Sequence, residues 1–294
     1  MSKFRAYFAA LPLAALVSFS LLAGQGTSAR ADATGDTIRT LFTKYQGAAV
    51  TLTVVIRAAG GGNGESQDLE LSAPAFVIDP SGLLVTSDAT VDPAGMMSRG
   101  GDPSQKVTTK VLSAKIVTMS GDTIPVQVVL RDSDRNLAFL RPVTPATTPM
   151  PYIDLHTAGD AHIGDAVYFL EPLGRAGNRM PSLVQYRIMS VLDRPRTLYV
   201  PDGQARGGTG SAAFNEQGAP LGLVTVRIGV GRAPTSMSTI STDTAIQVIV
   251  PAADILDEVK QAMAAKMPPP VAVTPLVKTP APASTTPQKP PARP

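Results

Sequence analysis

Short apolar runs separated by turn signals are the feature that most limits how this 294-residue chain can fold. Residues 75–91 contain two such runs joined by an Asp-Pro-Ser-Gly turn, and residues 115–130 contain two more around a Ser-Gly-Asp turn. Apolar runs of this length, interrupted by turn residues, are typical of antiparallel β-strands. With 25 Gly and 27 Pro available for further turns, the pattern predicts an all-β protein.

Helices are expected only near the two ends of the folded part. Residues 36–44 fit a short helix with Asp36 as its N-cap, and residues 47–56 then have the pattern of a strand. A second helix with one apolar face is predicted at residues 252–263, beginning after a proline. A Pro/Thr-rich link at residues 142–151 separates two halves of similar size, as expected between two barrels.

The first residues have the order of a secretory signal peptide. Basic residues precede an apolar run over residues 6–23, and a stretch of small residues follows. This order predicts a leader over residues 1–31 and export, with cleavage after Ala31 or Ala33. An uncleaved anchor is the alternative, but Pro12 interrupts the run and an Ala-x-Ala site follows it. We therefore expect no stable membrane span after cleavage.

Charge and cysteine content exclude several classes of function. The formal net charge is +3, but removal of Lys3, Arg5 and Arg30 with the leader would leave as many basic residues as the 23 acidic ones. No basic stripe remains to bind phosphates, so no nucleic-acid partner is expected. The chain has no cysteine, which excludes a disulfide framework and a lipidated cysteine at the leader junction. We predict neither a metal nor a cofactor.

A glycine-rich segment at residues 206–215, Arg-Gly-Gly-Thr-Gly-Ser-Ala-Ala-Phe-Asn, has the features of a nucleophile loop. Two glycines precede Thr209 and one follows it. Glycine permits backbone angles and close approaches that let successive N–H groups converge on one point. Oxyanion holes are built in this way. Gly207, Gly208 and Thr209 are therefore the predicted oxyanion-hole-like residues.

This loop is one of seven segments that, in order, resemble the trypsin-like serine proteases in their bacterial HtrA/Deg branch. Residues 75–91 are similar to the family's Gly-Phe-Ile-Ile-Asp-Pro-x-Gly-x-Ile-Leu-Thr-Asn-x-His-Val-Val, and residues 163–174 to its Val-Gly-Asp-x-Val-x-x-x-Gly-x-Pro-x-Gly. The resemblance covers about residues 36–266. It implies two antiparallel Greek-key β-barrels, at residues 36–150 and 151–266, with short N-terminal and C-terminal helices.

The resemblance also identifies the positions of the catalytic triad, and all three are changed. Ala89 stands at the histidine, Asn136 at the aspartate, and Thr209 at the serine of the family's Gly-Asn-Ser-Gly-Gly-Pro-Leu loop. Alanine cannot take a proton, asparagine offers no carboxylate, and threonine is more crowded than serine. The chain's two histidines, His156 and His162, both follow the link between the barrels, outside the segment that supplies the base. The pattern predicts an inactive homologue.

Two functions remain open at this point. The preferred one is a secreted protein of the bacterial periplasm that binds protein or peptide as an adaptor, a chaperone-like holder or a structural subunit. The rival is an active endopeptidase that uses Thr209 with an unconventional base. Asp88 neighbours Ala89, but in an extended segment its side chain should point to the opposite face.

The candidate peptide-binding edge follows the nucleophile loop. Substrates of the family bind by adding a strand beside the strand that follows the nucleophile loop. The resemblance therefore points to Leu221, Gly222, Leu223, Val224 and Thr225. The alternative is that these residues are simply barrel core, which their apolar pattern fits equally well.

Residues 267–294 differ in composition from the rest of the chain. Ten prolines lie in the 27 residues after Met267, and none of these residues is acidic. Such a composition favours extended polyproline II or disorder. A flexible spacer is the simpler interpretation, and a cell-envelope partner bound through the tail is the alternative. Many HtrA proteins carry PDZ domains at this point, for which these residues leave no room.

Overall fold

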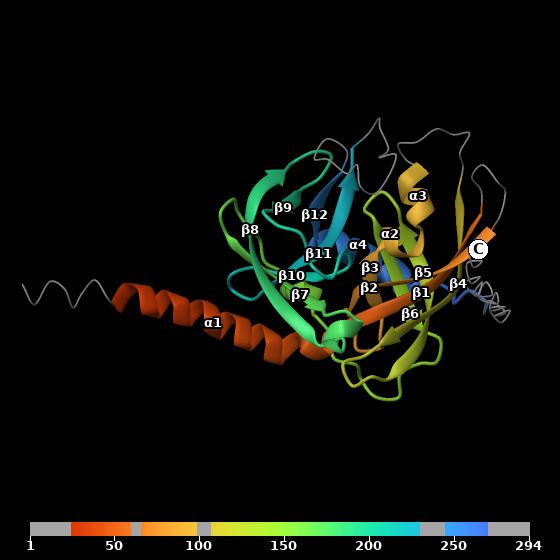
Figure 1. Ribbon diagram of the computed structural model, residues 1–294, viewed down its shortest axis with the longest axis horizontal. Helices are drawn as coiled ribbons and strands as arrows, with labels where there is room; N and C mark the ends of the chain where they lie inside the picture. Colours follow the sequence, from red (N-terminus) through yellow and green to blue (C-terminus); the bar gives the residue numbers. More distant parts are fainter. Residues whose placement is uncertain (1–24, 60–65, 99–106, 230–244, 270–294) are drawn as a thin grey trace, which may run out of the picture.

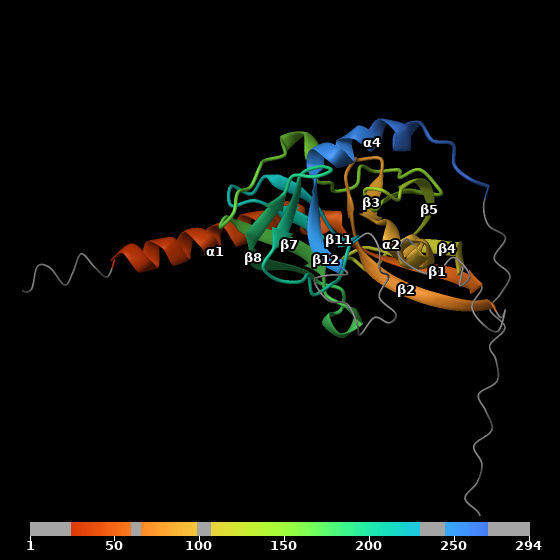
Figure 2. The same ribbon diagram turned by 90° about the horizontal axis from the view of Figure 1, so that it is seen from above.

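The computed structural model describes residues 25–59, 66–98, 107–229 and 245–269, with side chains from residue 34 onward except at residues 97 and 98. Two β-barrels lie side by side, the first helix extends away from them, and the last helix lies across one side of both (Figures 1 and 2). Most of the predicted leader and most of the proline-rich tail lie outside the described residues. None of the helices described is long and apolar enough to cross a membrane.

The first barrel is closed by antiparallel strands in the order β1-β2-β3-β6-β5-β4. Its strands are β1 (Ala49–Ala59), β2 (Ser66–Val77), β3 (Leu84–Ser87), β4 (Thr108–Val117), β5 (Thr123–Asp132) and β6 (Leu137–Pro142). Three consecutive strands lie side by side, and the fourth returns to pair with the first, which is the Greek-key connection. Apolar side chains such as Leu52, Val77 and Ile116 fill the interior.

The second barrel repeats this order, as β7-β8-β9-β12-β11-β10. Its strands are β7 (Ala166–Pro172), β8 (Pro181–Leu192), β9 (Leu198–Pro201), β10 (Ala212–Phe214), β11 (Pro220–Ile228) and β12 (Ala245–Pro251). Val167, Phe169 and Ile249 belong to its core. The prediction of two antiparallel Greek-key barrels is confirmed.

A further apolar cluster joins the barrels to each other. It contains Phe76 and Phe139 of the first barrel and Tyr168 and Phe214 of the second. The ring of Tyr45, at the end of the first helix, stacks on Phe214 with 4.8 Å between ring centroids. Because interiors of this kind are close-packed, the cluster fixes the position of one barrel against the other.

The helices frame the barrels. They are α1 (Gln25–Tyr45), α2 (Asp88–Val91), α3 (Pro93–Ser98) and α4 (Ala252–Ala264), with short 3₁₀ turns η1 (Gln46–Ala48), η3 (Leu155–Thr157) and η4 (Arg175–Gly177). Helix α4 confirms the predicted closing helix. Its C-terminal end is bound to the first barrel, because the guanidinium of Arg141 donates to the carbonyls of Met263 and Ala265 at 2.8 and 2.6 Å.

The predicted start of the first helix is wrong. Helix α1 begins at Gln25, so Asp36 lies within it and is not an N-cap. The carboxylate of Asp36 instead accepts a hydrogen bond from Arg39, one turn further along. Alanine-rich sequence precedes Asp36 without a proline, and alanine is the strongest helix former.

Candidate functional site

Ala89 and Asn136, the residues predicted at the histidine and aspartate positions of the triad, meet where the turn after β5 reaches helix α2. The side-chain oxygen Oδ1 of Asn136 accepts hydrogen bonds from the amide of Ala89 at 2.9 Å and from the hydroxyl of Ser87 at 3.2 Å. Its Nδ2 donates to the carbonyl of Val226 in β11 at 2.9 Å. Asn136 has a φ of 56°, in the left-handed region that asparagine tolerates better than most residues. Its amide group is therefore fixed from both barrels.

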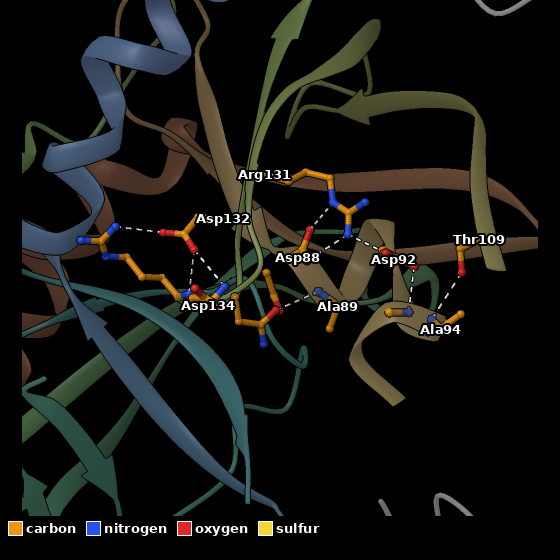
Figure 3. A network of polar contacts seen from close by, with 12 residues as sticks. Asp88, Ala89, Asp92, Ala94, Thr109, Arg131, Asp132 and Asp134 are labelled. Atoms are coloured by element: carbon orange, nitrogen blue, oxygen red, sulfur yellow. Dashed lines mark hydrogen bonds and ion pairs between the residues drawn. The ribbon is translucent and has the colours of Figure 1, made fainter. Parts of the chain in front are cut away.

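Asp88, the acidic neighbour of Ala89, is bound to a different partner. Residues 88–91 form helix α2 instead of continuing the predicted strand, so strand alternation does not set the direction of this side chain. The carboxylate is 5% exposed and accepts two hydrogen bonds from Arg131, at 2.5 and 3.0 Å. The same guanidinium binds Asp92 at 2.6 Å (Figure 3). The hydrogen bonds that Arg131 donates to Asp88 raise the pKa of Arg131, so the cation is permanent and holds Asp88 as its counter-ion.

The loop that carries Thr209 lies between β9 and β10 and is held on two sides. On one side, the amide of Gly210 donates to the carbonyl of Val224 at 2.7 Å, and the amide of Val224 donates to the carbonyl of Ser211 at 2.9 Å. On the other side the loop contacts β2: a Cβ added at Gly210 would overlap the carbonyl oxygen of Pro74. With a φ of +112°, Gly210 occupies a position that only glycine fits.

The family model of the trypsin-like peptidase domain matches residues 73–223. The matched residues run from β2 to β11, include Ala89, Asn136 and Thr209, and make up slightly more than half of the chain. The chain belongs to this family. No curated protein matches it.

In this trypsin-like domain the predicted oxyanion loop already binds a carboxylate, that of Glu171 at the end of β7. The amide of Gly207 donates to Oε2 at 2.9 Å, and the amide of Arg206 donates to Oε1 at 3.1 Å. The hydroxyl of Ser211 lies 3.3 Å from Oε2. Glu171 is 1% exposed, and burial raises its pKa although these hydrogen bonds oppose the shift. The loop amides that were expected to bind an anion thus bind a carboxylate of the same chain.

The remaining predicted loop residues have other partners or none. The amide of Gly208 donates to the carbonyl of Ala205 at 3.1 Å. Within the described part of the chain, the hydroxyl of Thr209 makes no hydrogen bond. His156 and His162 are exposed, and the imidazole of His162, 86% exposed, lies 3.5 Å from Asp165. No group of acidic or histidine residues that could hold a metal occurs in the ranges described above.

The segment predicted to bind peptide lies in β11, and its five residues are all buried: Leu221, Gly222, Leu223, Val224 and Thr225. These residues do not offer a free backbone edge, because β10 pairs with β11 as far as Leu223 and the nucleophile loop then bonds to Val224. Strand β12 pairs with the opposite side from Gly222 onward. Beyond Val224, two side chains of the first barrel bond to β11: the hydroxyl of Ser87 lies 2.9 Å from that of Thr225, and Nδ2 of Asn136 donates to the carbonyl of Val226.

Sequence reasoning missed Glu171. The residue lies 36 positions before Gly207 in the chain, so no local motif connects the two. The one available signal was an acidic residue inside a strand that is otherwise apolar, Ala-Val-Tyr-Phe-Leu-Glu-Pro. A buried carboxylate of that kind requires hydrogen-bond donors nearby.

Proposed function

We propose that this protein is an exported, non-catalytic member of the trypsin-like family, related to its HtrA/Deg branch, that binds extended peptide segments. The observation that carries the proposal is the bond from Gly207 to Glu171. Acyl transfer needs an amide that is free to stabilise the oxyanion, and here that amide has a buried carboxylate as its partner. A second negative charge at the same point would be repelled.

The absence of a base supports the same conclusion. A hydroxyl nucleophile needs a positioned group to remove its proton, and loss of the triad lowers turnover by roughly 10⁶-fold where this has been measured. Asn136 and Ala89 preserve the contact between their positions but neither can accept the proton of Thr209. The barrels and the loop are therefore retained without the groups that perform the chemistry.

A protease assay tests the non-catalytic assignment. We expect wild type, Thr209→Ala and Thr209→Ser to leave unfolded casein intact and to remain unlabelled by a fluorophosphonate probe. The matched control is Ser211→Ala, which removes the other hydroxyl of the loop. Wild-type cleavage that disappears in Thr209→Ala but persists in Ser211→Ala would overturn the proposal in favour of a threonine-dependent endopeptidase.

Peptide binding is proposed for the outer edge of β11 from Val226 to Ile228, next to the cleft between the barrels. Addition of an extended peptide to an open strand edge is a common mode of recognition. Binding on a peptide array should survive Thr209→Ala, because the edge does not involve that side chain. Absence of binding to any peptide or unfolded protein would contradict this part of the proposal.

Export to the periplasm is proposed from the leader pattern. Mass spectrometry of the exported protein should find an N-terminus near Asp32 or Thr34. Recovery of a peptide that starts at Met1 from the membrane fraction would favour an anchor instead. The proline-rich tail remains a proposed spacer, with a cell-envelope partner as the alternative.

A further inference from the structure

A cavity of about 410 Å³ opens beside Asn136, where the two barrels meet. The turn between β5 and β6 contributes one wall, and the end of β11 contributes another. Leu198, Val248 and Val250 add apolar surface from the second barrel. A volume of this size is within the range of about 300–1,000 Å³ that ligand-binding pockets occupy.

Two arginines of the cavity have no carboxylate partner in the described part of the chain. The Nη1 atom of Arg196 is buried and has no hydrogen-bond partner there. The guanidinium of Arg227 donates only a long hydrogen bond, at 3.3 Å, to the carbonyl of Arg194. A buried donor without an acceptor is rare in native proteins and unfavourable, so a ligand that offers Arg196 an acceptor would be stabilised.

The cavity lining contains two further charged residues, Arg135 and Asp134. Arg135 also lines the cavity, but its guanidinium is paired with Asp132 at 2.9 Å and Glu258 at 2.6 Å. Asp134, on the same turn, is an exposed lining residue.

Asp254, in helix α4, is the acidic residue that interacts electrostatically with Arg196, yet the two form no ion pair among the described residues. Burial raises the pKa of Asp254, so its carboxyl holds a proton more readily than an ordinary aspartate. The lining of the cavity thus combines apolar side chains with three arginines and one aspartate.

We propose that this cavity binds the acidic side chain of an extended peptide segment from a partner protein. The carboxylate is placed against Arg196 and Arg227, and the methylene groups of the side chain lie on Leu198 and Val250. The peptide backbone follows the edge of β11 at residues 226–228, which also lines the cavity. This inference rests on the proposed peptide-binding function and specifies the chemistry of its ligand.

The chain's own proline-rich tail has the wrong charge to occupy the cavity. No acidic side chain follows Met267, whereas Lys278, Lys289 and Arg293 do. These cations would be repelled by Arg196 and Arg227. A segment of another protein is therefore the occupant that fits the charge of the cavity.

A pair of capped peptides in one extended host sequence, identical except for a central Glu or Gln, tests the inference by fluorescence anisotropy. We expect the wild-type protein to bind the Glu peptide at least about tenfold more tightly, as a charge-assisted hydrogen bond predicts. Added salt should reduce this preference. Arg196→Gln should abolish it and Arg227→Gln should reduce it.

The matched control is Arg194→Gln, which removes the same charge two residues from Arg196 but does not line the cavity. This variant should keep the wild-type preference. Circular dichroism checks that each variant is folded, and Arg227→Gln, nearer the surface, tests the proposal if Arg196→Gln does not fold.

The outcomes separate this inference from the proposed function. Equal binding of the Glu and Gln peptides to wild type overturns the acidic ligand and leaves peptide binding intact, whereas binding of neither peptide overturns both. If a Gln peptide with a free C-terminus binds more tightly than the capped Glu peptide, the cavity recognises a terminal carboxylate and not an acidic side chain. Removal of residues 270–294 should leave the preference unchanged, and a change would implicate the tail.

Discussion

At the scale of single residues, Glu171 is a carboxylate buried in a strand that is otherwise apolar. A carboxylate in a strand interior is unfavourable unless donors compensate for lost water, and the loop amides of Arg206 and Gly207 supply that compensation. The glycine at 207 is part of the arrangement, because an added Cβ there would lie 3.2 Å from Oε2 of Glu171. One side chain therefore both orders the loop and occupies its anion site.

The raised pKa of Glu171 predicts a specific pH dependence of stability. Burial raises the pKa in the folded state above the ordinary 4.5, so the native protein binds the proton more tightly than the unfolded chain does. This contribution to stability is fully present at pH values below the pKa of Glu171 in the unfolded chain. It is lost as the pH rises through the pKa of Glu171 in the folded protein. We expect the free energy of unfolding of wild type, relative to Glu171→Gln, to fall with pH above about 4 and then level off.

Urea unfolding at a series of pH values measures this difference, and Asp92→Asn provides a control of opposite sign. Burial alone would raise the pKa of Asp92, but hydrogen bonds from Gly95 and Arg131 outweigh it and lower the pKa. Its stabilisation is present above the ordinary pKa and is lost as pH falls. A difference curve for Glu171 that rises with pH, as that of Asp92 should, would contradict the prediction.

Asn136→Asp restores the family's aspartate in one step, yet we expect it to destabilise the fold. The Nδ2 donor to the carbonyl of Val226 would be replaced by an oxygen, which leaves two acceptors facing each other. The loss should be about 1–3 kcal/mol in chemical unfolding. Asn178→Asp is the control, because Asn178 has a similar φ of 52° but is exposed. Equal effects of the two substitutions would show that the backbone, not the bond to Val226, decides the stability.

At the scale of elements, the nucleophile loop depends on glycines for two different reasons. Gly208 and Gly210 both have positive φ, at +91° and +112°, but a Cβ at Gly208 would meet no atom within 4 Å, whereas one at Gly210 would overlap the backbone of Pro74. We expect Gly208→Ala to lower the free energy of unfolding by about 1 kcal/mol from backbone strain alone. Gly210→Ala should lower it by at least about 2 kcal/mol more, because the loop must move away from β2. Equal losses in thermal or urea unfolding would contradict a tight contact at Gly210.

The strands were the most predictable elements, since apolar runs and Gly/Pro turns are local signals. The motif at residues 75–91 correctly placed the hairpin of β2 and β3, although its last residues form helix α2 and not strand. There Asp88 and Asp92 lie one turn apart, and both bind Arg131, which comes some 40 positions later in the chain. No local sequence pattern predicts a helix that is stabilised by such distant partners.

The residues of the candidate site were proposed from aligned motifs, but their contacts were not predictable from the sequence. Aligned motifs identified Ala89, Asn136 and Thr209 from the resemblance, and the fold brings Ala89 and Asn136 into direct contact. The partner of Gly207 was not predictable, because the bond to Glu171 forms only after β7 and the loop meet in the closed barrel. The buried β11 residues were misjudged for the same reason, since their pairing depends on β10 and the loop together.

At the scale of the whole molecule, the two barrels share one apolar cluster and one closing helix. Phe139 of the first barrel and Phe214 of the second belong to that cluster. Arg141 ties the end of α4 to β6, while Ile255 of α4 is buried in the shared cluster. The barrels therefore cannot separate without exposing apolar surface from both, which favours unfolding in a single cooperative step.

Arg141→Gln tests this coupling. The substitution removes two hydrogen bonds from a charged donor to the end of α4, and we expect the free energy of unfolding to fall by about 1–2 kcal/mol. Amide hydrogen exchange should show the same loss of protection in slowly exchanging strands of both barrels, because those amides exchange through the global transition. Arg187→Gln is the control: Arg187 binds the carbonyl of Gly164 at 2.6 Å within the second barrel alone. Two separate melting transitions, or protection lost from the first barrel only, would mean that the helix and the shared cluster do not couple the barrels.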